Sequence, residues 1–213
     1  RDEVIVKSDS AYLVNSMTSY IMRWRSNGYA DRKPAYRSAV ANVAYAWRDG
    51  SPVDDFGPMP AKFAERRFEL IASGLLLPAK APVWACDPYR IWSEADKATW
   101  DTDDSSAVSA WHVIVTLPPE YRGYWNKLIT DFADRHLVSK GAAIAYAIHA
   151  CEGADGEPIV HPHAHLIVTA RHWRHERRHG RRHPNWLGNI RQHAELRTKW
   201  RETMRALEFT MPD

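Results

Sequence analysis

The sequence is poor in cysteine and contains no long apolar run. Its two cysteines, Cys86 and Cys151, are too few for the disulfide frameworks that stabilise small secreted proteins. No stretch approaches the roughly 20 consecutive apolar residues that a membrane-spanning helix needs. The chain opens on charged residues and lacks the apolar block of a signal peptide. We therefore expect a cytoplasmic protein that is not inserted in a membrane.

A strong net charge is also missing, since the formal charge is only +3. Any electrostatic role must then depend on where the charges lie rather than on their sum. The 213 residues suffice for one domain with a substantial core. We expect a single domain over residues 1–213, which could be the N-terminal part of a longer protein. Histidine and tryptophan are unusually frequent, with eleven and ten copies.

Hydrophobic periodicity predicts a mixture of strands and helices. β-Branched and aromatic residues gather as in strands over residues 17–25, 111–117, 143–150 and 163–170. Apolar residues recur every three or four positions, as in helices, over residues 34–47, 88–103, 120–137 and 190–207. Residues 60–78 fit neither pattern. The mixture favours an α+β fold, in which we expect an antiparallel sheet with helices packed on one side.

Two histidines on one predicted strand form the sharpest chemical pattern. His163 and His165 are two residues apart, so both project from the same face of the strand, roughly 6–7 Å apart at the backbone. A turn centred near residues 156–157 would place His149 on the neighbouring antiparallel strand, opposite one of them. Three imidazoles on one face can bind one metal ion. We therefore predict a metal site at these three residues.

Three nitrogen ligands without a carboxylate or thiolate are typical of a catalytic metal site, because coordination positions stay open. The ion could then polarise a phosphoryl oxygen. The same arrangement would also serve a zinc hydrolase, and histidines on strands are often merely structural. His161 is a fourth ligand, a group that supports the ligands, or a loop residue, because we expect Pro162 to break the strand there.

A tyrosine lies on the helix predicted over residues 34–47. The core stripe of that helix is expected to consist of Tyr36, Val40, Val43 and Trp47. Tyr45 lies about 200° around the helix from Val43, at 100° per residue. It is therefore expected on the solvent side, beside small residues and Arg48, whose charge would favour a phenolate. Tyr45 could then attack a phosphate, or simply pack under a loop.

Five blocks of the chain resemble those of one protein family, in the same order over roughly residues 18–207. They are RSAVANVAY at 37–45, LLPAKAPVW at 76–84 with RIW at 90–92, the helix-to-strand block from 138 to 149, PHAH at 162–165, and WRE at 200–202. On these blocks the chain resembles the MobA/MobL mobilisation relaxases. That family is part of the histidine–hydrophobe–histidine (HUH) endonuclease superfamily.

The resemblance implies an antiparallel sheet of about five strands, with Tyr45 on an N-terminal helix above a histidine-ligated metal. Such relaxases nick one DNA strand at a plasmid origin of transfer. The tyrosine forms a 5′-phosphotyrosine link and frees a 3′-OH. Tyr45 would be the nucleophile, and His149, His163 and His165 would hold Mg²⁺ or Mn²⁺, with Zn²⁺ or Ni²⁺ as substitutes in a crystal.

The resemblance also implies partners and a location. The partners would be single-stranded origin-of-transfer DNA, accessory relaxosome proteins, and a coupling protein of a type IV secretion system. The enzyme would work in the bacterial cytoplasm and travel with the DNA into the recipient. Two other functions fit the same residues: a rolling-circle replication initiator with the same chemistry, and a relaxase-like DNA-binding module that has lost catalysis.

The chain departs from the family on the strand that ends at Leu117. The family often carries acidic residues on this strand, where this chain has His112 and Ile114. His112 is therefore a candidate base for Tyr45. It is equally well interpreted as a structural histidine.

Basic residues gather directly after the second histidine strand. Residues 171–183 contain six arginines and one glutamate, with Trp173 inside and Trp186 just beyond. Such a run can be just a solvated face, but arginines interleaved with aromatic residues favour contact with the phosphates and bases of single-stranded DNA. The residues expected to contact DNA are Arg37, Arg48, Lys140, Arg171, Arg174, Arg177, Arg178, Arg181 and Arg182.

Overall fold

An antiparallel sheet of five strands organises the chain, in the order β1-β5-β7-β6-β4. The structure is a computed structural model that describes residues 4–8, 38–100, 108–154, 158–173, 178–183, 187–188 and 190–208. The strands of the sheet are β1 Val4–Ser8, β4 Leu70–Leu76, β5 Ala110–Thr116, β6 Ile144–Glu152 and β7 Pro158–Thr169. The predicted α+β fold with about five antiparallel strands is confirmed.

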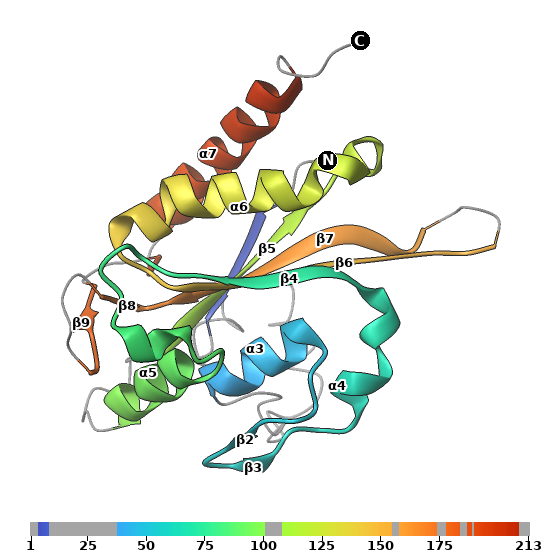
Figure 1. Cartoon of the computed structure of the whole chain (residues 1–213). Coiled ribbons are helices and arrows are strands. Elements are labelled where there is room, and N and C mark those ends of the chain that lie inside the picture. The colour runs from blue at the N-terminus through green and yellow to red at the C-terminus, as the bar shows by residue number, and fades with distance from the viewer. Residues whose placement is uncertain are drawn as a thin grey trace, which may run out of the picture.

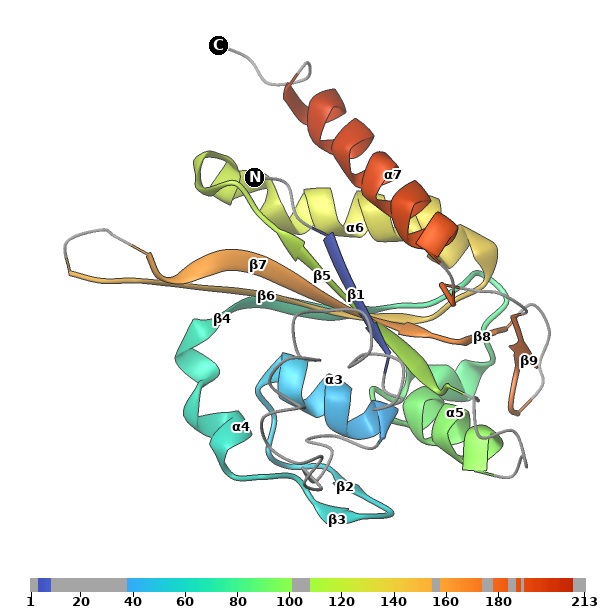
Figure 2. The same cartoon turned by 180° about the vertical axis from the view of Figure 1, so that it is seen from behind.

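Helices cover both faces of this sheet (Figures 1 and 2). The helices are α3 Ala39–Trp47, α4 Lys62–Glu65, α5 Arg90–Trp100, α6 Trp125–His136 and α7 Ile190–Glu208. α6 and α7 lie on one face, and α3 and α5 lie on the other (Figure 1). The expectation of helices on one side is therefore wrong. The physical reason is that β6 is buried along both of its faces, so each face needs a cover.

Shorter elements connect the main ones. Two pairs of two-residue strands are formed by β2 Val53–Asp54 with β3 Gly57–Pro58, and by β8 Arg171–His172 with β9 Arg181–Arg182. Turns of 3-10 helix lie at Arg67–Glu69, Val83–Cys86, Pro119–Tyr124 and Val138–Lys140. Within the residues that the structure describes, no helix has the length and apolar character of a membrane span.

Most predicted elements are present with shifted ends. The helix expected from residue 120 begins as a 3-10 turn and becomes α-helical at Trp125. Residues 60–78, which fit neither pattern, contain α4, a 3-10 turn and β4 in succession. The strand expected over 17–25 lies outside the described residues. β1 was not predicted.

Pro162 lies inside β7 and does not end the strand as expected. The register between β6 and β7 shifts between His149 and Cys151, so the ladder is irregular close to the proline. The carbonyl of Pro162 accepts a hydrogen bond from the N–H of Leu117 at 2.9 Å. A bulge tolerates the missing N–H of proline, which a regular ladder would not.

Candidate metal centre and nucleophile

Three histidines meet on the face of the sheet that α3 covers. His149 pairs with His163 across the β6–β7 ladder, and His165 pairs with Ala147 two residues further along. This is the register that the turn position predicted. One ring nitrogen from each histidine can be chosen so that all three lie within 4.8 Å of one another. The two Nε2 atoms of His163 and His165 are 3.2 Å apart.

Backbone carbonyls fix the tautomers of two of these histidines. His149 Nε2 lies 2.7 Å from the carbonyl oxygen of Ala46, and His163 Nδ1 lies 2.7 Å from that of His161. A carbonyl can only accept, so each of these nitrogens carries the proton and donates it. The lone pair of His163 Nε2 is thereby left for a ligand, while that of His149 Nδ1 faces Arg48 Nη2 at 3.3 Å. Such outer hydrogen bonds are usual for histidines that bind metals.

His112 makes the equivalent outer contact to the third histidine. Its Nε2 is 2.6 Å from Nδ1 of His165, and the two rings are tilted with centroids 4.8 Å apart. If Nδ1 of His165 donates, its Nε2 presents a lone pair toward His163. His112 thus contacts a candidate ligand directly. His161 contributes its carbonyl oxygen to the site, while its side chain is exposed.

Burial keeps the three histidines uncharged at neutral pH. Desolvation and the neighbouring Arg48 guanidinium lower the pKa of His149 to about 3. The pKa of His163 is lowered mainly by burial, and that of His165 is lowered by burial and by the adjacent imidazoles. A metal ion requires neutral imidazole as a ligand, and the uncharged state of these three rings meets that requirement.

The donor set fits a divalent metal ion. Two nitrogens bound at about 2.1 Å to one ion are separated by about 3–3.4 Å, and the His163–His165 pair already has this spacing. In the tautomer of His165 that donates from Nδ1, both Nε2 atoms present lone pairs, and a cation between them would remove their repulsion. The three histidines could therefore hold one ion and leave further coordination positions for oxygen ligands.

The N-terminus of α3 is held by two side chains. The Ser38 hydroxyl accepts a hydrogen bond from the N–H of Ala41 at 2.9 Å and caps the helix. Buried Asp96 of α5 accepts from the N–H of Ala39 at 2.8 Å and from that of Val40 at 3.3 Å. The helix thus begins at Ala39, later than the expected start at residue 34. The sequence analysis missed Asp96. Burial raises the pKa of its carboxyl group to about 6.

Tyr45 faces the histidines and is half-buried. Its ring packs edge-to-face against His165 with centroids 5.9 Å apart, and against Phe63 at 5.5 Å. The expectation that this face of α3 points to solvent is wrong. The cause is that α3 is enclosed between the sheet and neighbouring segments, so its small residues, Ser38 and Ala41 among them, are buried as well. Tyr36 lies outside the described residues.

Arg48 is buried beside Tyr45 and is not a surface cation. It ends α3 in the left-handed conformation, with φ of 55°. Its Nη2 lies 2.9 Å from Glu69 and 3.3 Å from Nδ1 of His149. Its guanidinium carbon sits 4.6 Å from the centroid of the Tyr45 ring. Arg48 thus forms an ion pair inside the site, and its expected contact with DNA stays a prediction.

Glu69 is the carboxylate that sequence reasoning missed. It is buried on the 3-10 turn before β4 and pairs with Arg48 and with Arg66, whose Nη2 lies 2.6 Å away. The only signal for it was its position directly before an apolar strand, within the stretch that fitted no pattern. It places a negative charge near the histidines on the side opposite His112.

Comparison with known proteins identifies the family. The MobA/MobL family model matches residues 37–208. The chain belongs to the MobA/MobL family. No curated protein matches its sequence.

The fold of this MobA/MobL protein is similar to that of a solved chain from work on the molecular basis of vancomycin resistance transfer in Staphylococcus aureus. The two share 20% sequence identity and a TM-score of 0.61, over 95% of this chain and 89% of the other. At this identity the likeness shows the fold alone. The MobA/MobL family is the one that the sequence predicted, and membership of it supports the interpretation of this chain as a mobilisation relaxase.

The two ends of the basic segment of this MobA/MobL protein pair as β8 and β9, here called the β8–β9 hairpin. Arg181 and Arg182 are exposed on it. Arg171 is half-buried and donates to the carbonyl of His179, while exposed Arg178 pairs with buried Glu94 of α5 at 2.9 Å. Three of the arginines expected to contact DNA, Arg37, Arg174 and Arg177, lie outside the described residues. Trp186, just beyond the basic segment, lies outside them as well.

Trp173 does not offer a surface for stacking. Its side chain is fully buried in the core between the sheet and α5, against the expectation that it would stack on DNA bases. A Cβ atom at Gly180 would lie 2.7 Å from its ring, so the hairpin backbone closes directly over the indole. The tryptophan therefore anchors the hairpin. Lys140, the remaining expected DNA contact, lies on the other face of the sheet.

Proposed function

We propose that this chain is a site- and strand-specific relaxase that nicks single-stranded DNA at a plasmid origin of transfer for conjugative mobilisation. The observation that carries the proposal is the position of Tyr45 beside a cluster of three neutral histidines, with its ring 5.9 Å from that of His165. Membership of the MobA/MobL family supports the same function. The tyrosine and the histidine cluster together favour an active enzyme over a degenerate binding module.

Tyr45 is the nucleophile in this proposal. Its Oη loses the phenolic proton and attacks the scissile phosphorus, and the bond from phosphorus to the 3′ oxygen breaks. That oxygen takes up a proton and leaves as a free 3′-OH, while the 5′ phosphate stays on Tyr45. The phosphotyrosine bond conserves the ester energy, so the strand can be rejoined by the reverse reaction.

His149 Nδ1, His163 Nε2 and His165 Nε2 would hold the divalent ion, which would act as a Lewis acid on the scissile phosphate. A set of three imidazoles favours Mn²⁺ over Mg²⁺, because Mg²⁺ prefers oxygen ligands. Zn²⁺ and Ni²⁺ should bind the same nitrogens more tightly still.

Three further side chains position these groups. Arg48 contacts the Tyr45 ring, and Glu69 holds Arg48 in place through their buried ion pair. A bound ion would replace the contact of Arg48 Nη2 with His149 Nδ1. His112 orients His165, because its Nε2 is engaged by that ring. A role for His112 as the base of Tyr45 stays a prediction.

The proposal extends to partners and location. Accessory relaxosome proteins would present the origin DNA, and a coupling protein would pass the covalent complex to a type IV secretion system. The protein would act in the bacterial cytoplasm and enter the recipient with the DNA. A rolling-circle replication initiator shares the chemistry, and the origin that is cleaved distinguishes the two.

The test is covalent adduct formation on single-stranded oligonucleotides from candidate origins of transfer, with Mn²⁺ or with EDTA, resolved on a denaturing gel. The wild type should form an adduct only with Mn²⁺ and only on the origin strand. Tyr45→Phe should form none and should bind the oligonucleotide with unchanged affinity. Tyr124→Phe is the matched control, because that tyrosine lies in the turn before α6. An adduct in Tyr45→Phe would refute the assignment.

A further inference from the structure

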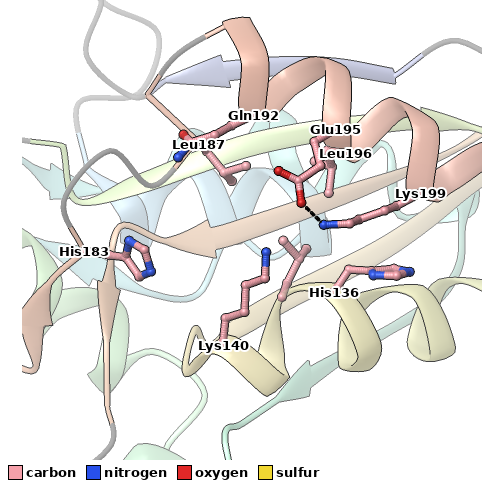
Figure 3. Close-up of a pocket in the computed structure, with 9 residues that line it drawn as sticks. His136, Lys140, His183, Leu187, Gln192, Glu195, Leu196 and Lys199 are labelled. Atoms are coloured by element: carbon pink, nitrogen blue, oxygen red, sulfur yellow. Dashed lines mark hydrogen bonds and ion pairs between the residues drawn. The ribbon is translucent and has the colours of Figure 1, made fainter.

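A cavity lies on the face of the sheet away from the histidines. Its volume is about 320 Å³, and it opens between the end of α6, the 3-10 turn Val138–Lys140 and the first half of α7 (Figure 3). Leu137 and Leu196, which form part of its wall, belong to the core beneath α6 and α7. The histidine cluster lies on the opposite face, under α3. The cavity is therefore a separate site, here called the lysine pocket.

Basic side chains from four segments converge on the lysine pocket. Lys140 points into it from the 3-10 turn and Lys199 from α7, while His136 and His183 stand on either side (Figure 3). Glu195 is the sole carboxylate among the described residues that line it, and it pairs with Lys199 one helical turn away. Two lysines thus share one carboxylate, which leaves the pocket positive.

The charges of the pocket repel one another. The pKa of Lys140 is lowered by burial and by the charge of Lys199. The pKa of His136 is lowered by burial and by the positive charges of Lys199, Arg135 and Lys140, against which Glu202 acts weakly. An anion bound between these groups would relieve the repulsion.

The wall of the pocket is apolar and fixed. Leu187 and Leu196 are buried, and Leu137 adds to the same wall. The carbonyl of Leu187 accepts a hydrogen bond from His193 Nε2 at 2.7 Å, and the N–H of Gly188 donates to Gln192 at 3.0 Å. The segment is thus held onto the first turns of α7. The volume exceeds that of a phosphate group, so an apolar ring can lie against the leucines while its phosphate meets the lysines.

The lysine pocket lies next to the β8–β9 hairpin. His183, which lines it, directly follows Arg181 and Arg182, and these two arginines are exposed on β9. A strand of DNA that follows the arginines therefore arrives at Lys140. We infer that the lysine pocket binds one phosphate-bearing nucleotide of single-stranded DNA, outside the stretch held at the histidine cluster. This inference deepens the proposed function and rests on it.

The test compares DNA of two lengths by fluorescence anisotropy in EDTA, so that no cleavage occurs. The short oligonucleotide covers about 8 nucleotides around the nick, and the long one about 30. Lys140→Gln should weaken binding of the long oligonucleotide about threefold to tenfold and reduce its salt slope by about 0.7, as expected for one lost phosphate contact. Binding of the short oligonucleotide, and adduct formation on it with Mn²⁺, should not change.

Lys127→Gln is the matched control, because Lys127 pairs with Asp131 on the exposed side of α6 as Lys199 pairs with Glu195 on α7. The Lys127→Gln variant should bind both oligonucleotides as tightly as the wild type does. Equal binding by wild type and Lys140→Gln, with adduct formation intact, would overturn the lysine pocket alone. Absence of adducts from the wild type would overturn the proposed function instead.

Titrations with small phosphate compounds show whether the lysine pocket prefers a nucleotide or a free anion. Inorganic phosphate and a deoxynucleoside monophosphate are titrated separately, and the imidazole signals of His136 and His183 are followed by NMR. The nucleotide should shift both signals at lower concentration than phosphate does. Tight binding of inorganic phosphate, with no effect of Lys140→Gln on long DNA, would assign the pocket to a free anion and refute the inference.

Discussion

The two faces of strand β6 present side chains of different size. β6 turns Ile144, Tyr146 and Ile148 toward α6 and α7, and it turns Ala145 and Ala147 toward α3. Large side chains fill the first face and build its core. Alanines on the second face let the backbone of α3 approach the strand. The face toward α6 and α7 therefore contributes most to stability. The face toward α3 has smaller side chains, which make room for a helix that carries functional groups.

The backbone of α3 lies close enough to β6 for hydrogen bonds between them. The Trp47 indole N–H donates to the carbonyl of Tyr146 at 3.0 Å, and His149 donates to that of Ala46 at 2.7 Å. Larger residues in place of the alanines would break these contacts. This division of the sheet leads to three predictions, which separate stability from activity.

The largest effect on stability is expected on the α6 face. Phe132 is fully buried and packs edge-to-face on Trp200, with centroids 5.1 Å apart. Phe132→Ala should lower the free energy of unfolding by about 3–5 kcal/mol, because it removes buried surface and leaves a cavity. Adduct formation at a temperature where the variant is folded should match the wild type. Urea denaturation and the gel assay measure the two effects, and a selective loss of activity would contradict the division.

Glu69→Gln should affect both stability and activity, because the ion pair with Arg48 lies on the functional face. We expect a loss of about 3 kcal/mol in unfolding free energy, since Arg48 would stay buried without its counter-charge. The rate of adduct formation should fall as Tyr45 loses its fixed neighbour. Arg66→Gln is the control: Arg66 also pairs with Glu69 but is half exposed, so its loss should cost less than about 1 kcal/mol. Equal effects of the two variants would argue against a positioning role.

The smallest effect is an acid sensitivity of the metal-free protein. The pKa of His149 is about 3 when folded, and a histidine in an unfolded chain titrates near 6.5. Below pH 6.5 the unfolded state therefore binds a proton that the folded state excludes, and the free energy of unfolding falls until about pH 3. At pH 5.5 the loss should be about 1 kcal/mol. In His149→Gln, the free energy of unfolding measured by urea titration should fall less steeply between pH 7 and 5. An unchanged pH dependence would show that His149 is not the cause of the acid sensitivity.

Strand parity made the histidine cluster predictable. Residues at i and i+2 and a turn of known position determine which side chains share a face, and the observed pairing of His149 with His163 follows from them. These rules are local, so a single sequence contains all that they need. The overall class of fold was predictable for the same reason.

The environment of Tyr45 could not be predicted in this way. Helical periodicity separates an apolar stripe from the rest, but it does not tell whether a second layer covers the rest, as it does for α3. The burial of Arg48 with Glu69 depends on the meeting of segments that are 21 residues apart. Trp173 was misjudged likewise, because an aromatic residue inside a basic run is buried or exposed according to the tertiary fold.

The hydrogen bond from His149 to Ala46 has a consequence for local unfolding. Ala46 directly follows Tyr45, so an opening of the last turn of α3 detaches a candidate ligand and displaces the nucleophile in one event. The end of α3 and the histidine cluster should therefore open as one cooperative unit. An ion that binds the cluster should slow amide hydrogen exchange in the last turn of α3 and leave exchange in α6 unchanged.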